Sequence, residues 1–281
     1  PTYGVEHHVL NLGAGVQSTA LYLLALDGKL KIDLAVFADT QEEPQGVYRH
    51  LDWLMTLGGP PIHVRTAGKL GDDLVLGRNS TGGRFVSIPA FTKGETGKVG
   101  MVRRQCTKEY KIEVCEKYIR REVLGLKPRQ RVPKGVTVYQ YFGISTDEEA
   151  RAIRAKDRFL KMKWTRPSYP LLDLRWSRTD CLAYLKDKVP HPVPKSACTF
   201  CPYRTNQEWA RMKATDPESW NRAVEVDNAL RADGSICTRG FRQQLYVHRT
   251  CVPLEVLDLG ALAPSTLDPM ATGECTGMCG T

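Results

Sequence analysis

The first 65 residues alternate short apolar runs with longer amphipathic stretches. The apolar runs at residues 8–12, 33–38 and 62–65 have the length of buried β-strands. Between them, residues 20–26 and 44–57 carry apolar side chains at helical spacing, and glycine or proline follows each stretch. This alternation predicts a βαβαβ unit, which folds into a parallel sheet with helices on both faces.

The pattern changes in the middle of the chain. Residues 66–104 contain eight glycines, which predicts a loop-rich insertion, with a hairpin over residues 84–91. A helix is predicted over 107–123 and a strand over 136–144. Residues 145–148 (STDE) have the pattern of a capping box and predict the start of another helix.

The last third of the chain has shorter elements. A helix is predicted over 177–186, and two more over 206–214 and 217–230, after a proline-rich step that contains His191. We therefore expect a Rossmann-like, doubly wound α/β domain over residues 1–190. A small helical extension that carries cysteines is expected to follow over 191–281.

Charge is concentrated in one part of the sequence. The 281 residues carry a net charge of +9, but residues 101–178 hold 20 basic and nine acidic side chains. A basic block attracts polyanions such as nucleic acid, although solvated helix faces give the same pattern. Lys108 and Lys111 are expected to share one helix face. The candidate contacts to phosphate or nucleic acid are Arg103, Arg104, Lys108, Lys111, Arg151 and Arg154.

The sequence does not favour a membrane or secreted protein. No apolar run approaches the ~18–20 residues of a membrane-spanning helix, and the first residues lack the pattern of a secretion signal. Nine cysteines cannot all pair, so metal binding or reactive thiols are more natural than a disulfide framework. We expect a cytoplasmic protein that has no membrane partner.

Two cysteines have the spacing of metal ligands. Cys198 and Cys201 form a CxxC followed by Pro202, and a two-residue gap lets both thiolates reach one metal centre. A reduced, buried or redox-active CxxC is the alternative. Cys115 lies at apolar spacing on its predicted helix and is expected in the core.

A turn of small residues follows the first predicted strand. Gly13, Ala14 and Gly15 would let the backbone approach a phosphate at a helix N-terminus, and Ser18 and Thr19 add hydroxyl donors. The spacing matches neither GxGxxG nor GxxxxGK[ST], so an ordinary tight turn is the alternative. Asp39 and Thr40 follow the neighbouring strand, at the sheet edge where open α/β sheets bind ligands.

These segments resemble the PP-loop adenine-nucleotide α-hydrolase superfamily, and within it the phosphoadenylyl-sulfate reductase family. The similarity lies in residues 12–18 (LGAGVQS), 39–40 (DT), 104–111 (RQCTKEYK), 143–151 (GISTDEEAR) and 169–174 (YPLLDL), in the expected order. The resemblance implies that ATP or phosphoadenylyl sulfate is bound by Gly13, Ala14, Gly15, Gln17, Ser18, Thr19, Asp39 and Thr40, and Mg²⁺ is a further candidate cofactor. Members that cleave ATP carry Asp where this chain has Gln17, so the resemblance supports nucleotide binding more strongly than ATP cleavage.

The same resemblance implies a [4Fe–4S] cluster held by Cys106, Cys198 and Cys201. Reductases that use four cysteines carry a Cys-Cys pair at the first site, and here Gln105 precedes Cys106. Three thiolates would leave one iron open to sulfide or a substrate group, as in related tRNA-thiolating enzymes. A fourth ligand from Cys181, Cys237 or Cys251, a zinc ion, and no metal at all remain alternatives.

The C-terminal tail carries two further thiols. Glu274-Cys275 resembles the Glu-Cys-Gly motif of sulfonucleotide reductases, whose cysteine is the nucleophile, and Cys279 lies four residues later. The resemblance makes Cys275 and Cys279 candidate catalytic residues, and a tail with incidental cysteines is the alternative.

Three functions follow from these features. The leading hypothesis is an enzyme that activates a nucleic-acid group with ATP and transfers sulfur through the cluster, as in DNA phosphorothioation or tRNA thiolation. It would need a sulfur donor such as a cysteine desulfurase. The second is a thioredoxin-dependent phosphoadenylyl-sulfate reductase that releases sulfite. The third is a non-catalytic nucleic-acid-binding protein with a structural metal.

Overall fold

The fold is built on a five-stranded, all-parallel sheet. The computed structural model describes residues 4–77, 88–232 and 242–262. Strands in the sheet follow the order β3-β2-β1-β6-β7, and every neighbouring pair is parallel. The strands are β1 (Val5–Leu12), β2 (Leu34–Asp39), β3 (Ile62–Thr66), β6 (Val136–Phe142) and β7 (Thr165–Ser168). The strand order reverses between β1 and β6, which confirms the Rossmann-like α/β class; open α/β sheets bind ligands beyond the carboxyl ends of the strands at such a point.

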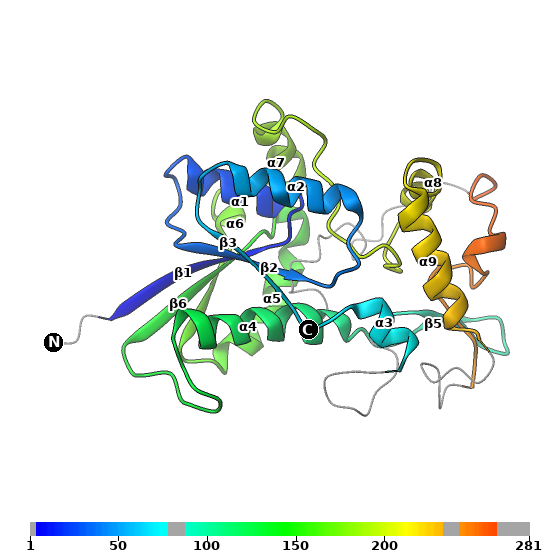
Figure 1. Ribbon diagram of the computed structural model, residues 1–281, viewed down its shortest axis with the longest axis horizontal. Helices are drawn as coiled ribbons and strands as arrows, with labels where there is room; N and C mark the ends of the chain where they lie inside the picture. The colour runs from blue at the N-terminus through cyan, green and yellow to red at the C-terminus, as the bar shows by residue number, and fades with distance from the viewer. Residues whose placement is uncertain (1–3, 78–87, 233–241, 263–281) are drawn as a thin grey trace.

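Helices cover both faces of this sheet (Figure 1). The first core cluster joins one face of the sheet to α1 (Val16–Leu26), α2 (Gln45–Thr56) and α7 (Arg178–Leu185). On the other face, α4 (Glu113–Tyr118) and α5 (Glu149–Leu160) each pack against the strands in a cluster of their own. The short helix α6 (Pro170–Asp173) follows β7. Because both faces are covered, β1 reads as a nearly continuous apolar run, and its last five residues are buried.

Two helices differ from the sequence prediction. Helix α1 begins at Val16 rather than at residue 20, so Gln17, Ser18 and Thr19 lie in its first turn. The helix predicted over 107–123 exists, but it is π-helical over Lys108–Ile112 and Ile119–Val123 and α-helical only in between. The wider π turns change which side chains share a face. A 3₁₀ turn at Thr146–Glu148 precedes α5, close to the predicted cap.

A second, smaller sheet lies outside the parallel one. It has the order β5-β4-β8 and joins β4 (Phe91–Lys93) and β5 (Val99–Met101) to β8 (Leu245–Tyr246) in antiparallel pairs. The hairpin is therefore β4–β5, downstream of the predicted 84–91, of which residues 84–87 lie outside the described residues. The C-terminal part is not purely helical as expected, because β8 completes this sheet.

The second apolar core combines the insertion with the C-terminal part. It contains residues of α3 (Leu70–Val75), α8 (Asn206–Thr215), α9 (Pro217–Ala229) and the 3₁₀ turn Leu254–Val256. Both predicted C-terminal helices are present. Figure 1 shows α8 and α9 beside the sheet, beyond the carboxyl ends of its strands, rather than over either face. This places the CxxC segment close to the crevice of the parallel sheet. Within the described ranges, no helix is long and apolar enough to span a membrane.

Candidate functional site

Local hydrogen bonds close the turn between β1 and α1. Ala14 adopts a positive φ of 56°, a conformation that lets the chain reverse sharply after the strand. The Gly15 N–H donates to Ser18 Oγ (3.2 Å), and the Thr19 N–H donates to the Gly15 carbonyl (2.9 Å). The first-turn N–H groups of α1 therefore start directly behind this turn, which is the geometry that attracts phosphate.

The segment after β6 presses against the same turn. A Cβ atom on Gly143 would lie 2.7 Å from Ser18 N and 2.9 Å from Gln17 C, so only glycine fits there without movement. Gln17 is fully buried, and its Nε2 donates to Ser145 Oγ (3.3 Å) and to Glu148 Oε2 (3.2 Å). A polar network thus joins the start of α1 to the segment after β6, at the point where the strand order reverses.

Two arginines complete the network around Gln17. Arg178 Nη1 donates to Gln17 Oε1 (2.9 Å), and Arg151 Nη1 pairs with the buried Glu148 carboxylate (2.6 Å). Both ends of the Gln17 amide are therefore held by protein groups. In this arrangement the Gln17 side chain ties the turn between β1 and α1 to the segments that carry Ser145, Glu148 and Arg178.

The loop after β2 connects the parallel sheet to the rest of the site. Asp39 Oδ1 accepts hydrogen bonds from the Gln41 N–H (2.7 Å) and the Tyr48 hydroxyl (2.8 Å). Thr40 is buried, and its hydroxyl lies 3.2 Å from Cys198 Sγ. The two predicted motifs, DT and CxxC, are 158 residues apart in sequence and in direct contact in space.

Two buried acids next to Thr40 strengthen this junction. Glu42 pairs with Arg222 of α9 (2.6 Å) and accepts the Gly71 N–H (3.1 Å), while its carbonyl accepts the Thr199 N–H (2.7 Å). Glu43 pairs with the buried Lys111 at 3.0 Å. Sequence reasoning did not single out Glu42, Glu43 or Arg222, although an acidic pair directly after a buried strand was a visible signal.

The three predicted cluster ligands line one pocket. Cys106, Cys198 and Cys201 surround it, together with Thr40, Arg104 and Lys111. The CxxC turn is closed by the Cys201 N–H, which donates to the Cys198 carbonyl (3.0 Å). Burial, and secondarily the Glu43 carboxylate, raise the pKa of the Cys198 thiol well above its usual value. The six cysteines in the described part of the chain form no disulfide.

The residues that line this pocket suit a thiolate-bound group, but the free volume of the pocket is small. Three thiols with basic neighbours are a natural donor set for an anionic iron–sulfur cluster, or for zinc. The free volume is about 20 Å³, room for about one water molecule. Among residues 4–77, 88–232 and 242–262, no three His, Cys, Asp or Glu side chains are already arranged as metal ligands. A cluster would need the walls of this pocket to separate.

The basic residues divide into exposed and buried members. Lys108 is exposed and lies 3.6 Å from Glu113, whereas Lys111 is buried against Glu43, so the predicted shared face is not observed. The π-helical geometry of this segment separates them. Similarly, Arg151 is buried against Glu148 while Arg154 is exposed. Arg103 is exposed and Arg104 half-buried.

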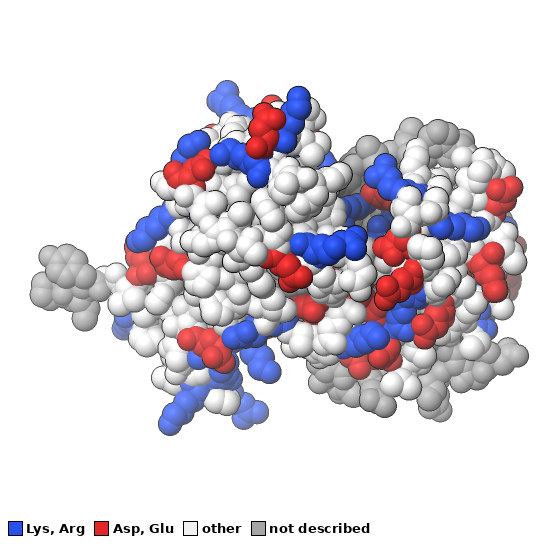
Figure 2. Space-filling model, turned by 45° about the horizontal axis from the view of Figure 1, so that its top comes forward, with Lys and Arg blue, Asp and Glu red and all other residues white. Residues whose placement is uncertain are grey.

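On the face drawn in Figure 2, basic and acidic side chains are interspersed. The sequence block therefore does not appear there as one continuous basic field. Part of the charge of residues 101–178 is buried in the folded protein, because Lys111 pairs with Glu43 and Arg151 pairs with Glu148. The exposed candidates for contact with a polyanion are Arg103, Lys108 and Arg154.

A histidine pair joins the phosphate turn to the segment before the CxxC. His50 Nε2 lies 2.8 Å from Thr19 Oγ1, and His50 Nδ1 lies 2.8 Å from His191 Nε2. Burial, and secondarily the neighbouring His191, lower the pKa of His50 to about 4. The sequence placed His191 only in the proline-rich step before the CxxC, and His50 was not identified, because its helix showed only an apolar pattern.

The remaining predictions concern the other cysteines. Cys115 is buried in the core between α4 and the sheet, as expected. Cys275 and Cys279, the candidate catalytic thiols, lie outside the described residues, as does Cys237.

Comparison with models of protein families, with curated proteins and with solved structures found no match.

Proposed function

We propose that this protein is an adenine-nucleotide-dependent sulfur-transfer enzyme that acts on a nucleic acid. The observation that carries the proposal is the contact between Thr40 and Cys198. It brings a thiol-lined pocket to the edge of a Rossmann-like sheet, next to the crevice where such folds bind nucleotides. A nucleotide and a thiol-bound sulfur carrier could therefore act on the same substrate group.

Each part of the site has a role in this proposal. The turn at residues 13–15 and the first N–H groups of α1 bind the nucleotide phosphates. Gln17 keeps the turn in position through its hydrogen bonds to Ser145 and Glu148. Thr40 orients Cys198, and the Asp39 carboxylate lies at the same strand end. ATP would activate the acceptor by adenylation, with release of pyrophosphate.

Cys106, Cys198 and Cys201 are the residues that would hold a [4Fe–4S] cluster. When bound, such a group supplies iron-bound sulfur or electrons to the reaction. Arg104 and Lys111 line the same pocket and would compensate its negative charge. The exposed Arg103, Lys108 and Arg154 are proposed to contact the nucleic-acid backbone, whether DNA or tRNA.

Anaerobic purification followed by iron and acid-labile sulfide analysis tests the proposal. We expect both elements in the wild-type protein, and their loss in Cys198→Ser. Cys115→Ser is the matched control, because Cys115 lies in the core between α4 and the sheet and does not line the pocket. Release of pyrophosphate from ATP, stimulated by DNA or tRNA, is the activity assay. Iron-free protein with no effect of Cys198→Ser on activity would contradict the proposal.

Phosphoadenylyl-sulfate reduction is the second candidate, and Gln17 favours it. A reductase of this kind binds its nucleotide without cleaving the α–β bond, and both ends of the Gln17 amide are held by protein groups. Cys275 or Cys279 would then act as the nucleophile, with thioredoxin as reductant. Sulfite formation from phosphoadenylyl sulfate, lost in Cys275→Ser, would support it.

The same experiments separate the remaining alternative. A non-catalytic nucleic-acid-binding protein with structural zinc would contain zinc in place of iron and sulfide. It would bind DNA or RNA with a steep salt dependence and would release no pyrophosphate.

A further inference from the structure

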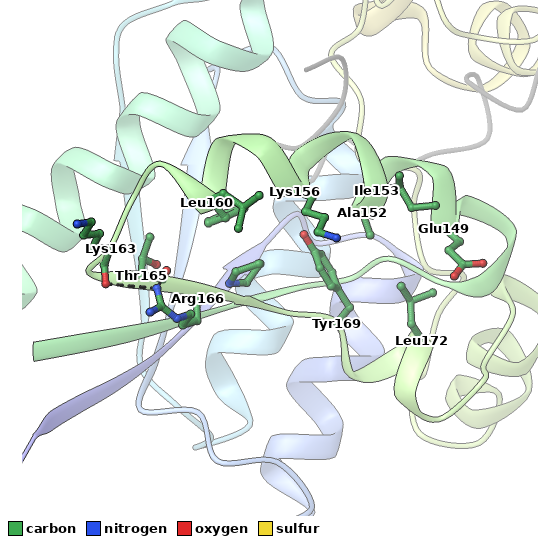
Figure 3. Close-up of a pocket in the computed structure, with 12 residues that line it drawn as sticks. Glu149, Ala152, Ile153, Lys156, Leu160, Lys163, Thr165, Arg166, Tyr169 and Leu172 are labelled. Carbon is green, nitrogen blue, oxygen red and sulfur yellow. Dashed lines mark hydrogen bonds between the residues drawn. The ribbon is translucent and has the colours of Figure 1, made fainter.

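A second pocket lies at the β7 edge of the parallel sheet, opposite the β3 edge. It is formed between α5 and the edge strand β7, and Figure 3 shows the residues that line it. Its volume is about 540 Å³. This lies within the range of about 300–1,000 Å³ typical of pockets for small organic ligands.

The walls of this pocket are mainly apolar. Phe159 and Leu172 belong to the core cluster beneath it, and Ile153 and Leu160 rise along its α5 wall. Ile153 and Leu160 are 65% and 68% exposed, far more than is usual for large apolar side chains. They are seven residues apart, so they share one side of α5. A continuous apolar surface is thus left open beside the sheet.

One end of the pocket is basic. Lys163 and Arg166 lie together at that end in Figure 3, Lys156 lies midway along α5, and Glu149 lies at the other end. Arg166 Nη1 donates to the carbonyls of Lys163 (3.3 Å) and Thr165 (3.0 Å). Within the described chain, none of these three cations forms an ion pair with a carboxylate. The positive charge of all three is therefore available to an anion, and Lys156 is the one that lies beside Tyr169 in Figure 3.

A hydrogen-bond donor is also available in the pocket. The hydroxyl of Tyr169 is buried and has no hydrogen-bond partner among the described residues. Figure 3 shows its ring directed toward α5, the helix that carries Lys156. Burial raises the pKa of Tyr169 to about 12, so the group keeps its proton near neutral pH. A buried hydroxyl without an acceptor is costly, and a ligand acceptor would relieve that cost.

We propose that this pocket binds a small organic acid, an apolar aliphatic or aromatic body carrying one carboxylate or sulfonate group. The body would lie along Ile153 and Leu160, and the anionic group would accept hydrogen bonds from Tyr169 and Lys156. Added β-strands are disfavoured at this edge, because Pro167 in the middle of β7 has no N–H to donate. The inference does not depend on the proposed function, since the pocket shares no residue with the cysteine site.

Ligand binding can be measured directly on the full chain. The probe is the fluorescent anion 8-anilinonaphthalene-1-sulfonate, with decanoate as competitor and decanol as its uncharged counterpart. We expect one saturable site from which decanoate displaces the dye at least tenfold more effectively than decanol. Tyr169→Phe and Lys156→Gln each remove one donor to the charged group, so each is expected to weaken decanoate binding about tenfold.

Lys161→Gln is the matched control, because Lys161 is an exposed cation of the same segment that does not line the pocket. It should leave the affinity unchanged, and circular dichroism should show all three variants folded. Equal binding by every variant, equal competition by decanol, or no saturable site at millimolar ligand would each overturn the proposal. A dimer that Leu160→Glu dissociates would also overturn the proposal, since a second copy of the chain would then cover the pocket.

Discussion

Replacing Gly143 by alanine gives the sharpest test of how the crevice is built. The new Cβ would meet Ser18 N at 2.7 Å and Gln17 C at 2.9 Å, whereas ordinary contact begins near 3.4 Å. Both opposing atoms belong to the backbone, so no side chain can rotate away. The segment after β6 and the phosphate turn must therefore separate by about 0.7 Å, the difference between 3.4 Å and 2.7 Å.

That separation breaks more than one contact. The hydrogen bond from Gln17 to Ser145 is already 3.3 Å long, so a further 0.7 Å would take it to about 4.0 Å, beyond hydrogen-bonding distance. Overpacking costs about 1–3 kcal/mol and each lost hydrogen bond about 0.5–1.5 kcal/mol. We expect the free energy of unfolding to fall by about 2–4 kcal/mol, and, if the proposed nucleotide site is correct, the affinity for ATP to fall with it.

Urea unfolding measures the stability change, and titration calorimetry measures nucleotide affinity. Gly46→Ala is the matched control. Gly46 lies in helix α2, and the nearest atom to an added Cβ would be Pro194 Cβ at 4.0 Å. The control should be neutral or more stable by up to about 1 kcal/mol. If Gly143→Ala proved as stable as Gly46→Ala and bound ATP normally, the close approach of β6 to the phosphate turn would be wrong.

Three further predictions concern buried charge. Lys111→Met should lower the free energy of unfolding in urea by about 3–5 kcal/mol because it leaves the Glu43 carboxylate buried without its cation, and adding Glu43→Gln should recover most of this loss. Stability should also fall as pH drops from 6.5 toward about 4, because the unfolded chain protonates His50 while burial keeps the folded imidazole neutral. His50→Gln should flatten this dependence by up to about 2 kcal/mol in urea titrations at several pH values, and an unchanged slope would contradict it. Gln17→Glu should destabilise by about 1–3 kcal/mol by placing a second carboxylate beside Glu148, and thermal unfolding of the double variant with Glu148→Gln should show partial recovery.

The parallel sheet could be predicted because its evidence is local. Apolar runs of strand length alternate with helical patterns, and short connections then leave few possible topologies. The same reasoning missed the start of α1 at Val16, because the apolar pattern of a helix says little about its polar first turn. It also missed the π-helical turns around Lys108–Ile112, since an apolar pattern does not distinguish an α-helix from short π-helical turns.

The second sheet could not be predicted for a different reason. Strand β8 has two residues, and β4 and β5 have three each, too short for a period-two pattern to stand out. Strand β4 pairs locally with β5, but it also pairs with β8 more than 140 residues away, and the sheet closes an apolar core. Their stability lies in long-range contacts, so the division into a sheet domain and a helical extension described only part of the packing.

The sequence alone determined the Rossmann-like class, the turn of small residues after β1, and the CxxC pair of Cys198 and Cys201. These features are encoded by residue type and by spacing over a few positions. Only the tertiary structure decided which charges remain at the surface, that Thr40 meets Cys198, and that Gln17 is held by Ser145, Glu148 and Arg178. Burial and pairing across more than 100 residues depend on how the whole chain packs, and no local pattern records them.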